Sequence, residues 1–236
     1  MPLRFSTPHP YCAALFLFVA GRAAATEVAL VVSFEQDCPP DVTKSLRAEV
    51  QRVMNSADLR IRWVPCEQSS GQVFQRLVVV RFRGRCEIPH VGRSNSSSRI
   101  LGSAEVSDGA ILPYVTVYCS RVVRALPIET DRQAFTARLR ALGRALGRVV
   151  AHELYHIFGQ TRKHGRWGLA QRTLTGSELT EPGAWFEKPD LESIRRGLVP
   201  RSGDPKGVGA EAAVRELRQP LQGFRRAAGA SFAGEP

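Results

Sequence analysis

The sequence predicts a mixed α/β fold in which a sheet packs against one long helix. Three observations predict this class. Residues 27–64 show a strand, a helix and a strand in succession, residues 75–123 are rich in β-branched and apolar side chains, and residues 131–158 carry an apolar stripe at helical spacing. The length of 236 residues suits one medium domain with a core of its own.

The first three elements follow from hydrophobic spacing. Glu27–Phe34 is apolar and β-branched almost throughout, which is typical of a buried strand. Asp41–Ser56 has apolar residues three or four positions apart and predicts a helix. Leu59–Val64 alternates apolar and polar residues and predicts a strand, so we expect a β-α-β opening.

Three further strands are predicted before the long helix. Gln75–Arg83 is one. Ile111–Val123 is another, although Pro113 indicates that its first part lies at an edge or outside the hydrogen-bonded ladder. Ile100–Val106 is the candidate edge strand. An edge strand beside a cleft can bind an extended peptide by strand addition, and the alternative is an ordinary hairpin arm.

A long helix is predicted from about Asp131 to Phe158. Thr130 and Gln133 resemble a capping box at its start, and Gly159 is placed to end it in the left-handed conformation. Its apolar stripe consists of Phe135, Leu139, Leu142, Leu146, Val149 and Val150.

Two glycines and four arginines distinguish this helix. Gly143 and Gly147 each cost about 1 kcal/mol relative to alanine, and we expect close packing against the sheet to compensate. The arginines expected on or near the solvent side are Arg138, Arg140, Arg144 and Arg148. A small C-terminal subdomain follows, with a final helix over residues 189–197.

The two ends of the chain differ from the middle in composition. Residues 1–25 are predicted to be a signal peptide, because Arg4 precedes the short apolar run Cys12–Ala20 and small residues follow it. An uncleaved anchor is the alternative. Residues 26–200 form the domain, and residues 201–236 are predicted to be a disordered basic tail rich in Gly, Ala and Pro. We expect a secreted or periplasmic protein with no transmembrane segment after cleavage.

Cysteine usage fits an exported protein. Four cysteines remain after signal cleavage, and an even number favours two disulfides. The sequence does not decide among the three pairings. There is no Cys-x-x-Cys pair, so a thiolate zinc site is a poor alternative to a histidine site. The four are Cys38, Cys66, Cys86 and Cys119.

The formal net charge of +11 would attract anionic partners, and the alternative is a solvated basic surface. The chain lacks the aromatic and basic interleaving that stacks nucleic-acid bases, and it contains no recognisable nucleic-acid module. Specific nucleic-acid binding is therefore not expected.

The candidate site lies near the end of the long helix, in the sequence His152-Glu153-Leu154-Tyr155-His156. The two histidines are four residues apart, so they project from one face about 6 Å apart along the axis and can share one metal ion. Glu153 lies about 100° round the helix, where it can reach a metal-activated water. The surrounding residues are uncharged, and burial of an unpartnered Glu153 would be costly, which favours a metal site over a chance match.

A catalytic zinc site needs a third protein ligand and one open position. His164, on the segment that follows the helix, is the nearest candidate. His90 precedes the candidate edge strand and is expected at the surface. A downstream glutamate is the alternative third ligand, and the candidates are Glu178, Glu181, Glu187 and Glu192.

On these residues the chain resembles the zincin metallopeptidases, and within them the metzincins. The resemblance covers residues 27–171 in the order of elements, ending in a long helix with His-Glu-Leu-Tyr-His and a glycine. The metzincin pattern has its third histidine where Arg162 stands, two residues before His164. It also has a methionine in a turn below the metal, whereas both methionines of this chain lie upstream. Leu169 or Ala170 could supply an apolar floor there.

The resemblance implies a zincin-like fold with a mixed twisted sheet, an edge strand beside the cleft, a long active-site helix and a small C-terminal subdomain. It implies an exported zinc-dependent endopeptidase acting on a protein or peptide. One Zn²⁺ would be held by His152, His156 and His164, with Glu153 as general base. The alternative is a non-catalytic zincin-like domain with a structural or vestigial zinc site that binds an acidic partner at the cell envelope.

Overall fold

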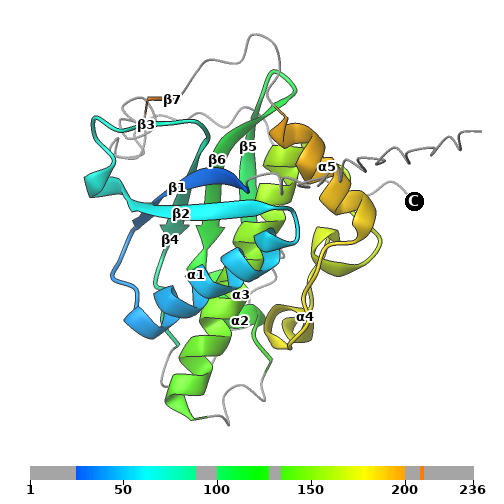
Figure 1. The fold of residues 1–236 in the computed structure, drawn as a ribbon. Coiled ribbons are helices and arrows are strands. Elements are labelled where there is room, and N and C mark those ends of the chain that lie inside the picture. The colour runs from blue at the N-terminus through cyan, green and yellow to red at the C-terminus, as the bar shows by residue number, and fades with distance from the viewer. Residues whose placement is uncertain (1–24, 89–99, 128–133, 200–207, 210–236) are drawn as a thin grey trace, which may run out of the picture.

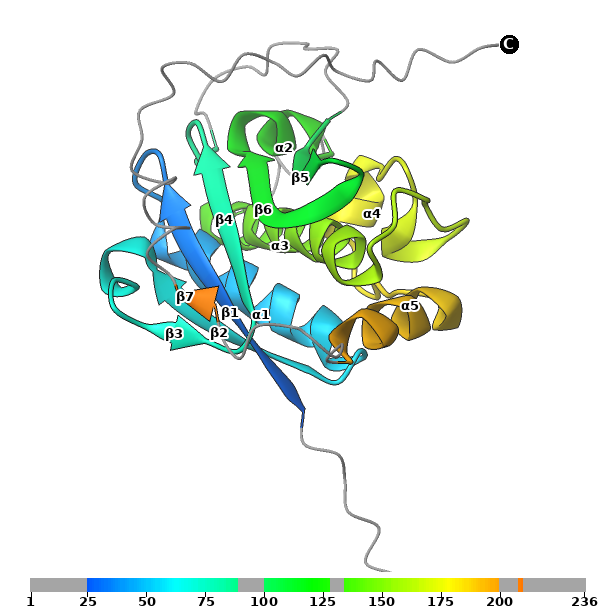
Figure 2. The same ribbon diagram turned by 90° about the horizontal axis from the view of Figure 1, so that it is seen from above.

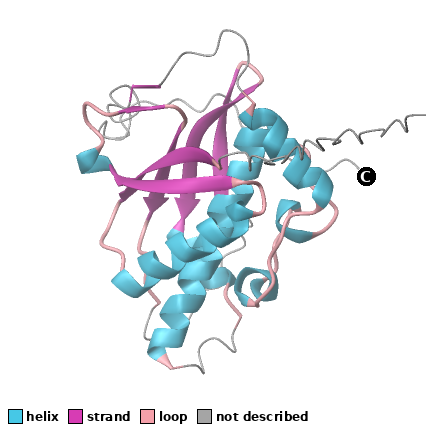
Figure 3. Ribbon diagram, viewed as in Figure 1, coloured by secondary structure: helices cyan, strands magenta, loops and turns pink. Residues whose placement is uncertain are grey.

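The computed structural model describes residues 25–88, 100–127, 134–199 and 208–209. In this part of the chain a mixed five-stranded sheet packs against helices, which confirms the mixed α/β class (Figures 1 and 3). The sheet strands are β1 (Thr26–Phe34), β2 (Leu59–Pro65), β4 (Leu77–Arg83), β5 (Gly102–Ser107) and β6 (Ala110–Tyr118). The helices are α1 (Pro40–Asn55), α2 (Cys119–Ala125), α3 (Phe135–Gly159), α4 (Gly176–Thr180) and α5 (Lys188–Leu198). The shorter elements are η1 (Cys66–Gln68), η3 (Gly168–Ala170), β3 (Val73–Phe74) and β7 (Val208–Gly209).

The predicted β-α-β opening is confirmed. β1 pairs in parallel with β2 on one side and with β4 on the other, and α1 connects β1 to β2. The strand order is β2-β1-β4-β6-β5, so β5 is an edge strand as predicted, and it runs antiparallel to β6. α1 and α3 lie on the same side of the sheet (Figure 2).

Pro113 has no N–H to donate, and the prediction that it lies outside a hydrogen-bonded ladder is confirmed. β6 pairs with β4 only from Tyr114 onward, whereas Ala110 and Ile111 pair with β5 alone. Pro113 therefore lies in the part of β6 that is outside the β4 ladder.

The predicted strand over residues 111–123 is wrong in its second half. β6 ends at Tyr118, and α2 begins at Cys119. Cys119, Val122 and Val123 are all buried at positions that share one face of a helix. The apolar run therefore satisfies a helix as well as a strand, and its composition alone does not separate the two.

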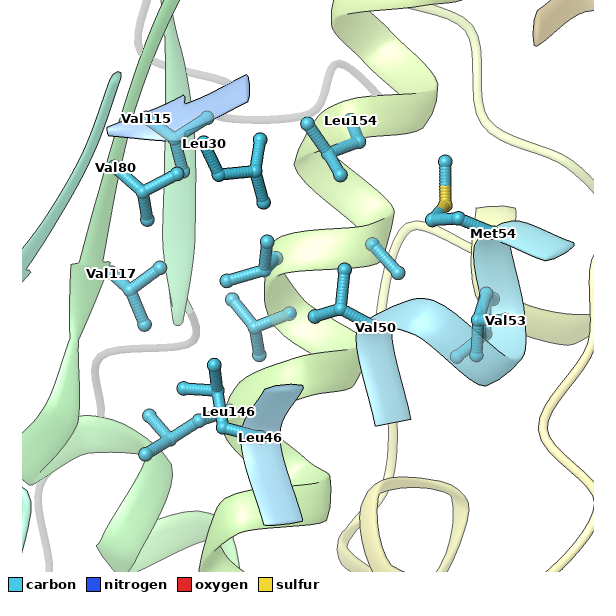
Figure 4. Packing of buried hydrophobic residues seen from close by; sticks show 14 of the residues in the cluster. Leu30, Leu46, Val50, Val53, Met54, Val80, Val115, Val117, Leu146 and Leu154 are labelled. Carbon is cyan, nitrogen blue, oxygen red and sulfur yellow. The ribbon is translucent and has the colours of Figure 1, made fainter. Parts of the chain in front are cut away.

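The main core lies between the sheet and the helices α1 and α3. Leu30 and Val80 from the sheet face Leu146 and Leu154 from α3, and Leu46 and Val50 of α1 complete the layer (Figure 4). A smaller cluster occupies the opposite face of the sheet. Alternate residues of β1 belong to the two clusters, so its central residues are buried on both faces.

Gly143 and Gly147 pack closely, but their partner is α1 and not the sheet. A Cβ at Gly143 would lie 2.5 Å from the carbonyl oxygen of Val42, and one at Gly147 would lie 3.0 Å from that of Leu46. The glycines thus let two helix backbones approach each other. The predicted close packing is confirmed, and the predicted partner was wrong.

Arg148 was expected near the solvent side of α3, and this is wrong, because it is only 1% exposed. Its guanidinium forms an ion pair of 2.7 Å with Glu49 of α1 and donates to the carbonyl oxygens of Glu178 and Glu181. These acceptors offset the desolvation of the charge. Arg140, by contrast, is exposed as predicted.

The end of α3 differs from the prediction by one residue. Gly159 is the last helical residue, and Gln160 takes the left-handed conformation with φ 44° and ψ 44°. The side-chain amide of Gln160 donates to the carbonyl oxygens of Ile157 and Ile111, which stabilises a conformation that glycine would otherwise adopt. A Cβ at Gly159 would lie 2.9 Å from the Ser193 hydroxyl, so glycine lets α3 approach α5 closely at this point. The predicted cap residues 130–133 lie outside the described residues.

The final helix is confirmed as α5, and Ile194 and Leu198 dock on the core. The signal peptide falls outside the described residues except for Ala25, and so does most of the predicted tail. Within that tail, Val208 and Gly209 form β7 and pair antiparallel with β3. The disorder of the remaining tail residues stays a prediction. No helix of the described ranges is long and apolar enough to cross a membrane.

The structure contains a disulfide between Cys86 and Cys119, and Cys38 and Cys66 are thiols. The expectation of two disulfides is therefore wrong. Cys38 packs against the core cluster on the helix side of the sheet, whereas Cys66 belongs to the cluster on the opposite side. The sheet separates the two thiols, so they do not bond to each other.

Candidate metal centre

Helix α3 places His152 and His156 one turn apart on the same face, as their spacing predicts. Their ring centroids lie 4.7 Å apart, and their Nε2 atoms face each other at 3.0 Å. The helix is rigid here because it is buried on most sides: Ala151, Leu154 and Ile157 all belong to the core.

Backbone carbonyls fix the orientation of both rings. The His152 Nδ1 lies 2.7 Å from the carbonyl oxygen of Leu169, and the His156 Nδ1 lies 2.6 Å from that of Thr161. A carbonyl oxygen only accepts hydrogen bonds, so each Nδ1 carries the proton and donates it. In the neutral rings each Nε2 is then a bare acceptor, and the two lone pairs point at each other.

This pair of facing lone pairs fits a bound cation. Two nitrogens that share a tetrahedral zinc ion at about 2.0–2.1 Å lie about 3.3 Å apart, close to the Nε2 separation in the structure. Carbonyl acceptors on the far nitrogen are also the usual outer partners of metal-bound histidines. The donor set and its geometry therefore suit a metal ion, and imidazole suits zinc among other transition metals.

His164 completes the cluster. Its ring centroid lies 5.4 Å from that of His152 and 4.9 Å from that of His156. One ligand atom from each of the three side chains lies within 4.8 Å of the others, so the three can hold a metal ion together. Arg162, two residues before His164, is exposed and does not belong to the cluster.

The candidate glutamates take other roles. Glu178 accepts from the backbone and side chain of Thr175 in a capping box at the start of α4. Glu187 forms a second capping box with Asp190 at the start of α5. None of the four candidates, which all lie in the described ranges, joins the histidine cluster. His90 lies outside the described residues.

Desolvation and neighbouring positive charge favour the neutral form of the imidazoles. Desolvation lowers the pKa of His152 to about 4, with a further contribution from the charge of His156. The pKa of His164 is likewise lowered to about 4, first by desolvation and then by His156 and Arg172. Burial also lowers the pKa of His156. The rings are therefore in the form that binds metal at neutral pH.

Glu153 is not part of the histidine cluster, and its side chain lies against the edge strand β5. Its side chain is only 5% exposed, and a Cβ at Gly102 would lie 3.0 Å from its Oε1. The backbone N–H of Ala104 donates to its carboxylate. Desolvation outweighs this bond and raises the pKa of Glu153 to about 7, which suits a group that accepts and returns a proton near neutral pH.

Sequence reasoning missed the carbonyls and the hydroxyl that organise the site. The oxygens of Thr161 and Leu169 orient the two helical histidines, and the Tyr155 hydroxyl donates to the Lys163 carbonyl next to His164. Every residue has a carbonyl, so composition gives no signal for the first two. Tyr155 lies within the motif and could have been noted as a buried hydroxyl in need of an acceptor.

Leu169 and Ala170, which the sequence suggested as an apolar floor below the metal, are buried. They are 1% and 0% exposed and belong to the main core, and η3 carries both of them. The side chain of Leu169 thus packs inward while its carbonyl oxygen accepts from His152.

Comparisons with known proteins do not place the chain. No family model, no curated protein and no solved structure matches it.

Proposed function

We propose that the protein is an exported zinc-dependent metallopeptidase of the zincin type, with the third histidine displaced. One observation carries this proposal: two Nε2 atoms, each with its Nδ1 committed to a carbonyl, face each other at 3.0 Å beside a third histidine. Such an arrangement is costly for a protein without a cation, because neither ring can donate to the other. A buried glutamate with a raised pKa next to this cluster suits hydrolysis.

The residues divide the proposed reaction among them. His152, His156 and His164 would hold the ion, which when bound would supply an activated water and a polarised carbonyl. Glu153 takes a proton from the attacking water and passes it to the leaving amine. The N–H of Ala104 keeps the Glu153 carboxyl beside β5 between these two transfers.

The edge strand β5 supports a peptide as the substrate. It lies at the end of the sheet order, with β6 on its inner side, and Gly102 brings it directly onto Glu153. A peptide that adds to the outer edge of β5 as a further strand would run past the general base.

The test compares zinc content and peptide hydrolysis in the wild type, Glu153→Gln and the control Glu192→Gln. Glu192 is an exposed glutamate of α5, so its substitution removes a carboxylate away from the site. We expect one zinc ion in all three proteins and a fall in kcat/KM of about 10²–10⁴-fold in Glu153→Gln alone. Undiminished hydrolysis by Glu153→Gln would rule out the proposed role of Glu153.

The same measurement separates the non-catalytic alternative. A wild-type protein that holds one zinc ion but cleaves no peptide in a diverse pool would be a zincin-like binding domain. That result would support the proposed metal site and contradict the proposed peptidase activity.

The disulfide supports the exported location. Cys86 and Cys119 are both fully buried and bonded, and such bonds persist in oxidising compartments. Signal cleavage after Ala25 would give a mature chain that begins at Thr26, the first residue of β1. The intact mass of the protein recovered from the exported fraction tests this, and a mass that retains residues 1–25 would contradict cleavage.

A further inference from the structure

The residues Thr161–Ala170, here called the ligand segment, serve the metal site twice. The segment carries the third histidine, and its Thr161 and Leu169 carbonyls orient the other two. His164 is exposed, and it lies in the irregular segment after α3 and not on the helix. The segment must therefore be held in place by other contacts if His164 is to meet the helical pair.

Tyr155 provides one of these contacts. It is only 5% exposed, its ring stacks on Phe186 at 5.8 Å, and its hydroxyl donates to the carbonyl oxygen of Lys163 at 3.1 Å. That carbonyl belongs to the peptide bond that joins Lys163 to His164. The hydroxyl therefore fixes the backbone directly before the third ligand from a rigid helix that also bears the first two.

Close packing holds the other side of His164. The Gly165 N–H donates to the carbonyl oxygen of Ala170 at 2.8 Å. A Cβ at Gly165 would lie 2.9 Å from the Ala170 Cβ and 3.2 Å from both carboxylate oxygens of Asp190. His164 is thus bracketed by one hydrogen bond from α3 and by a glycine fitted between the ligand segment and α5.

We propose that Tyr155 is a positioning residue of the metal site, whose hydroxyl holds His164 within reach of the ion. A ligand on a free turn loses conformational freedom when the metal binds, and a preorganised one does not. The hydroxyl thus raises metal affinity without contacting the metal. This inference rests on the metal-binding part of the proposed function and is independent of peptidase activity.

The test is a double-mutant cycle read out as the zinc dissociation constant, measured by chelator competition. The four proteins are the wild type, Tyr155→Phe, His164→Ala and the double variant. Tyr155→Phe keeps the ring and its contact with Phe186 and removes only the hydroxyl. We expect it to weaken zinc binding by about 10-fold in the wild type, as loss of an outer partner does, and by less than about 2-fold in His164→Ala.

Tyr118→Phe is the matched control. Its ring lies 4.0 Å from the Arg121 guanidinium, a contact that phenylalanine retains, and it stands at the end of β6. Its zinc affinity should equal that of the wild type. The melting temperatures of the zinc-free proteins show whether a loss of affinity only reflects a loss of stability.

The outcomes that overturn the proposal are specific. Equal losses of affinity from Tyr155→Phe in both backgrounds would mean that Tyr155 does not act through His164. A wild-type zinc affinity in Tyr155→Phe would also overturn the proposal. So would a His164→Ala variant that binds zinc as tightly as the wild type, because His164 would then not be a ligand. If Tyr155→Phe does not fold, Gly165→Ala replaces it in the same cycle, because it displaces the turn from the other side. Absence of peptide hydrolysis with the expected affinities would overturn only the peptidase.

Discussion

At the scale of single residues, Glu153 is a carboxylate that the fold buries and the proposed chemistry needs. Its pKa in the folded protein is raised from 4.5 to about 7 by burial. At pH 8 the folded state must therefore carry an ionised carboxylate that the unfolded state solvates more easily. The protein gives up stability to hold a base at this position.

Glu153→Gln should make the zinc-free protein more stable at pH 8. At about 1.4 kcal/mol per pKa unit, the shift corresponds to a gain of about 3–4 kcal/mol in the free energy of unfolding. Below pH 4.5 the carboxyl is protonated in both states, so the gain should disappear. Urea unfolding in a chelator at pH 8 and pH 4 measures both. An equal or lower stability of the variant at pH 8 would contradict the cost of burial.

The histidine ligands give the opposite dependence on pH. His152 and His164 have folded pKa values lowered from 6.5 to about 4, so the folded state binds these protons less tightly than the unfolded state. In the zinc-free protein they contribute stability that is fully present above pH 6.5 and is lost as the pH falls toward 4. Glu153 titrates with the opposite sign in an overlapping range, so the measurement belongs in the Glu153→Gln background.

In that background, the melting temperature in a chelator should fall between pH 6.5 and pH 4. Adding His152→Asn and His164→Asn removes both titrating rings and should flatten the fall, although other carboxyl groups still contribute. Thermal unfolding across this range checks the difference between the two proteins. Parallel curves would show that these histidines do not have lowered pKa values.

At the scale of elements, the contact between α1 and α3 sets the place of the site-bearing helix. Gly143 and Gly147 let the helices approach closely, and the buried Arg148–Glu49 ion pair lies on the same contact. The ends of α3 follow from different contacts: Gly159 packs on α5, and Gln160 bonds to β6. Contacts with α1, α5 and β6, three elements that are distant in sequence, therefore fix the position of the histidine pair.

Gly143→Ala should destabilise the protein although alanine favours helices. The new Cβ would lie 2.5 Å from both the Val42 carbonyl oxygen and the Ser45 Cβ, and backbone atoms cannot move aside cheaply. We expect a net loss of about 2 kcal/mol, because the cost of overpacking exceeds the gain of about 1 kcal/mol in helix propensity. Chemical unfolding measures it, with the exposed Arg140→Ala on the same helix as a control expected to change stability by less than about 0.5 kcal/mol. A more stable Gly143→Ala would refute the close contact.

Most elements could be predicted because their hydrophobic periods are unambiguous, as in β1, α1 and α3. The turn from β6 into α2 could not, because Cys119–Val123 is a short apolar run that either period accepts. Arg148 was misplaced for a different reason. An arginine is predicted to face solvent unless the sequence reveals its partners, and here these come from α1, from α4 and from the residue that caps the end of α4.

At the scale of the whole molecule, the candidate site combines three parts of the chain that the fold brings together. The long helix supplies two histidines and Glu153, the ligand segment supplies His164 and two carbonyls, and β5 supplies Gly102 and the Ala104 N–H. The helical pair was predictable from local geometry alone. The contribution of β5 depends on the strand order of the sheet, and the carbonyl contacts depend on the path of the ligand segment, neither of which a residue pattern encodes.

The disulfide links the segment after β4 to the residue directly after β6. Cys86 follows β4, Cys119 follows β6, and the loop of 33 residues that they close contains β5. The bond therefore restrains the strand that lies on Glu153. It also limits the freedom of the unfolded chain, which for a loop of this length stabilises the fold by about 3–4 kcal/mol in the chain-entropy model.

Replacing both cysteines by alanine should therefore lower the free energy of unfolding by about 2–4 kcal/mol. The loss should fall on β5 first, because its outer edge has no neighbouring strand in the described sheet and the loop that holds it is no longer closed. Chemical unfolding measures the global effect, and amide hydrogen exchange measures the protection of β5 relative to β1. A reductant should destabilise the wild type and leave the double variant unchanged, because Cys38 and Cys66 are already thiols. Unchanged exchange in β5, with global stability reduced, would show that the sheet alone holds this strand against Glu153.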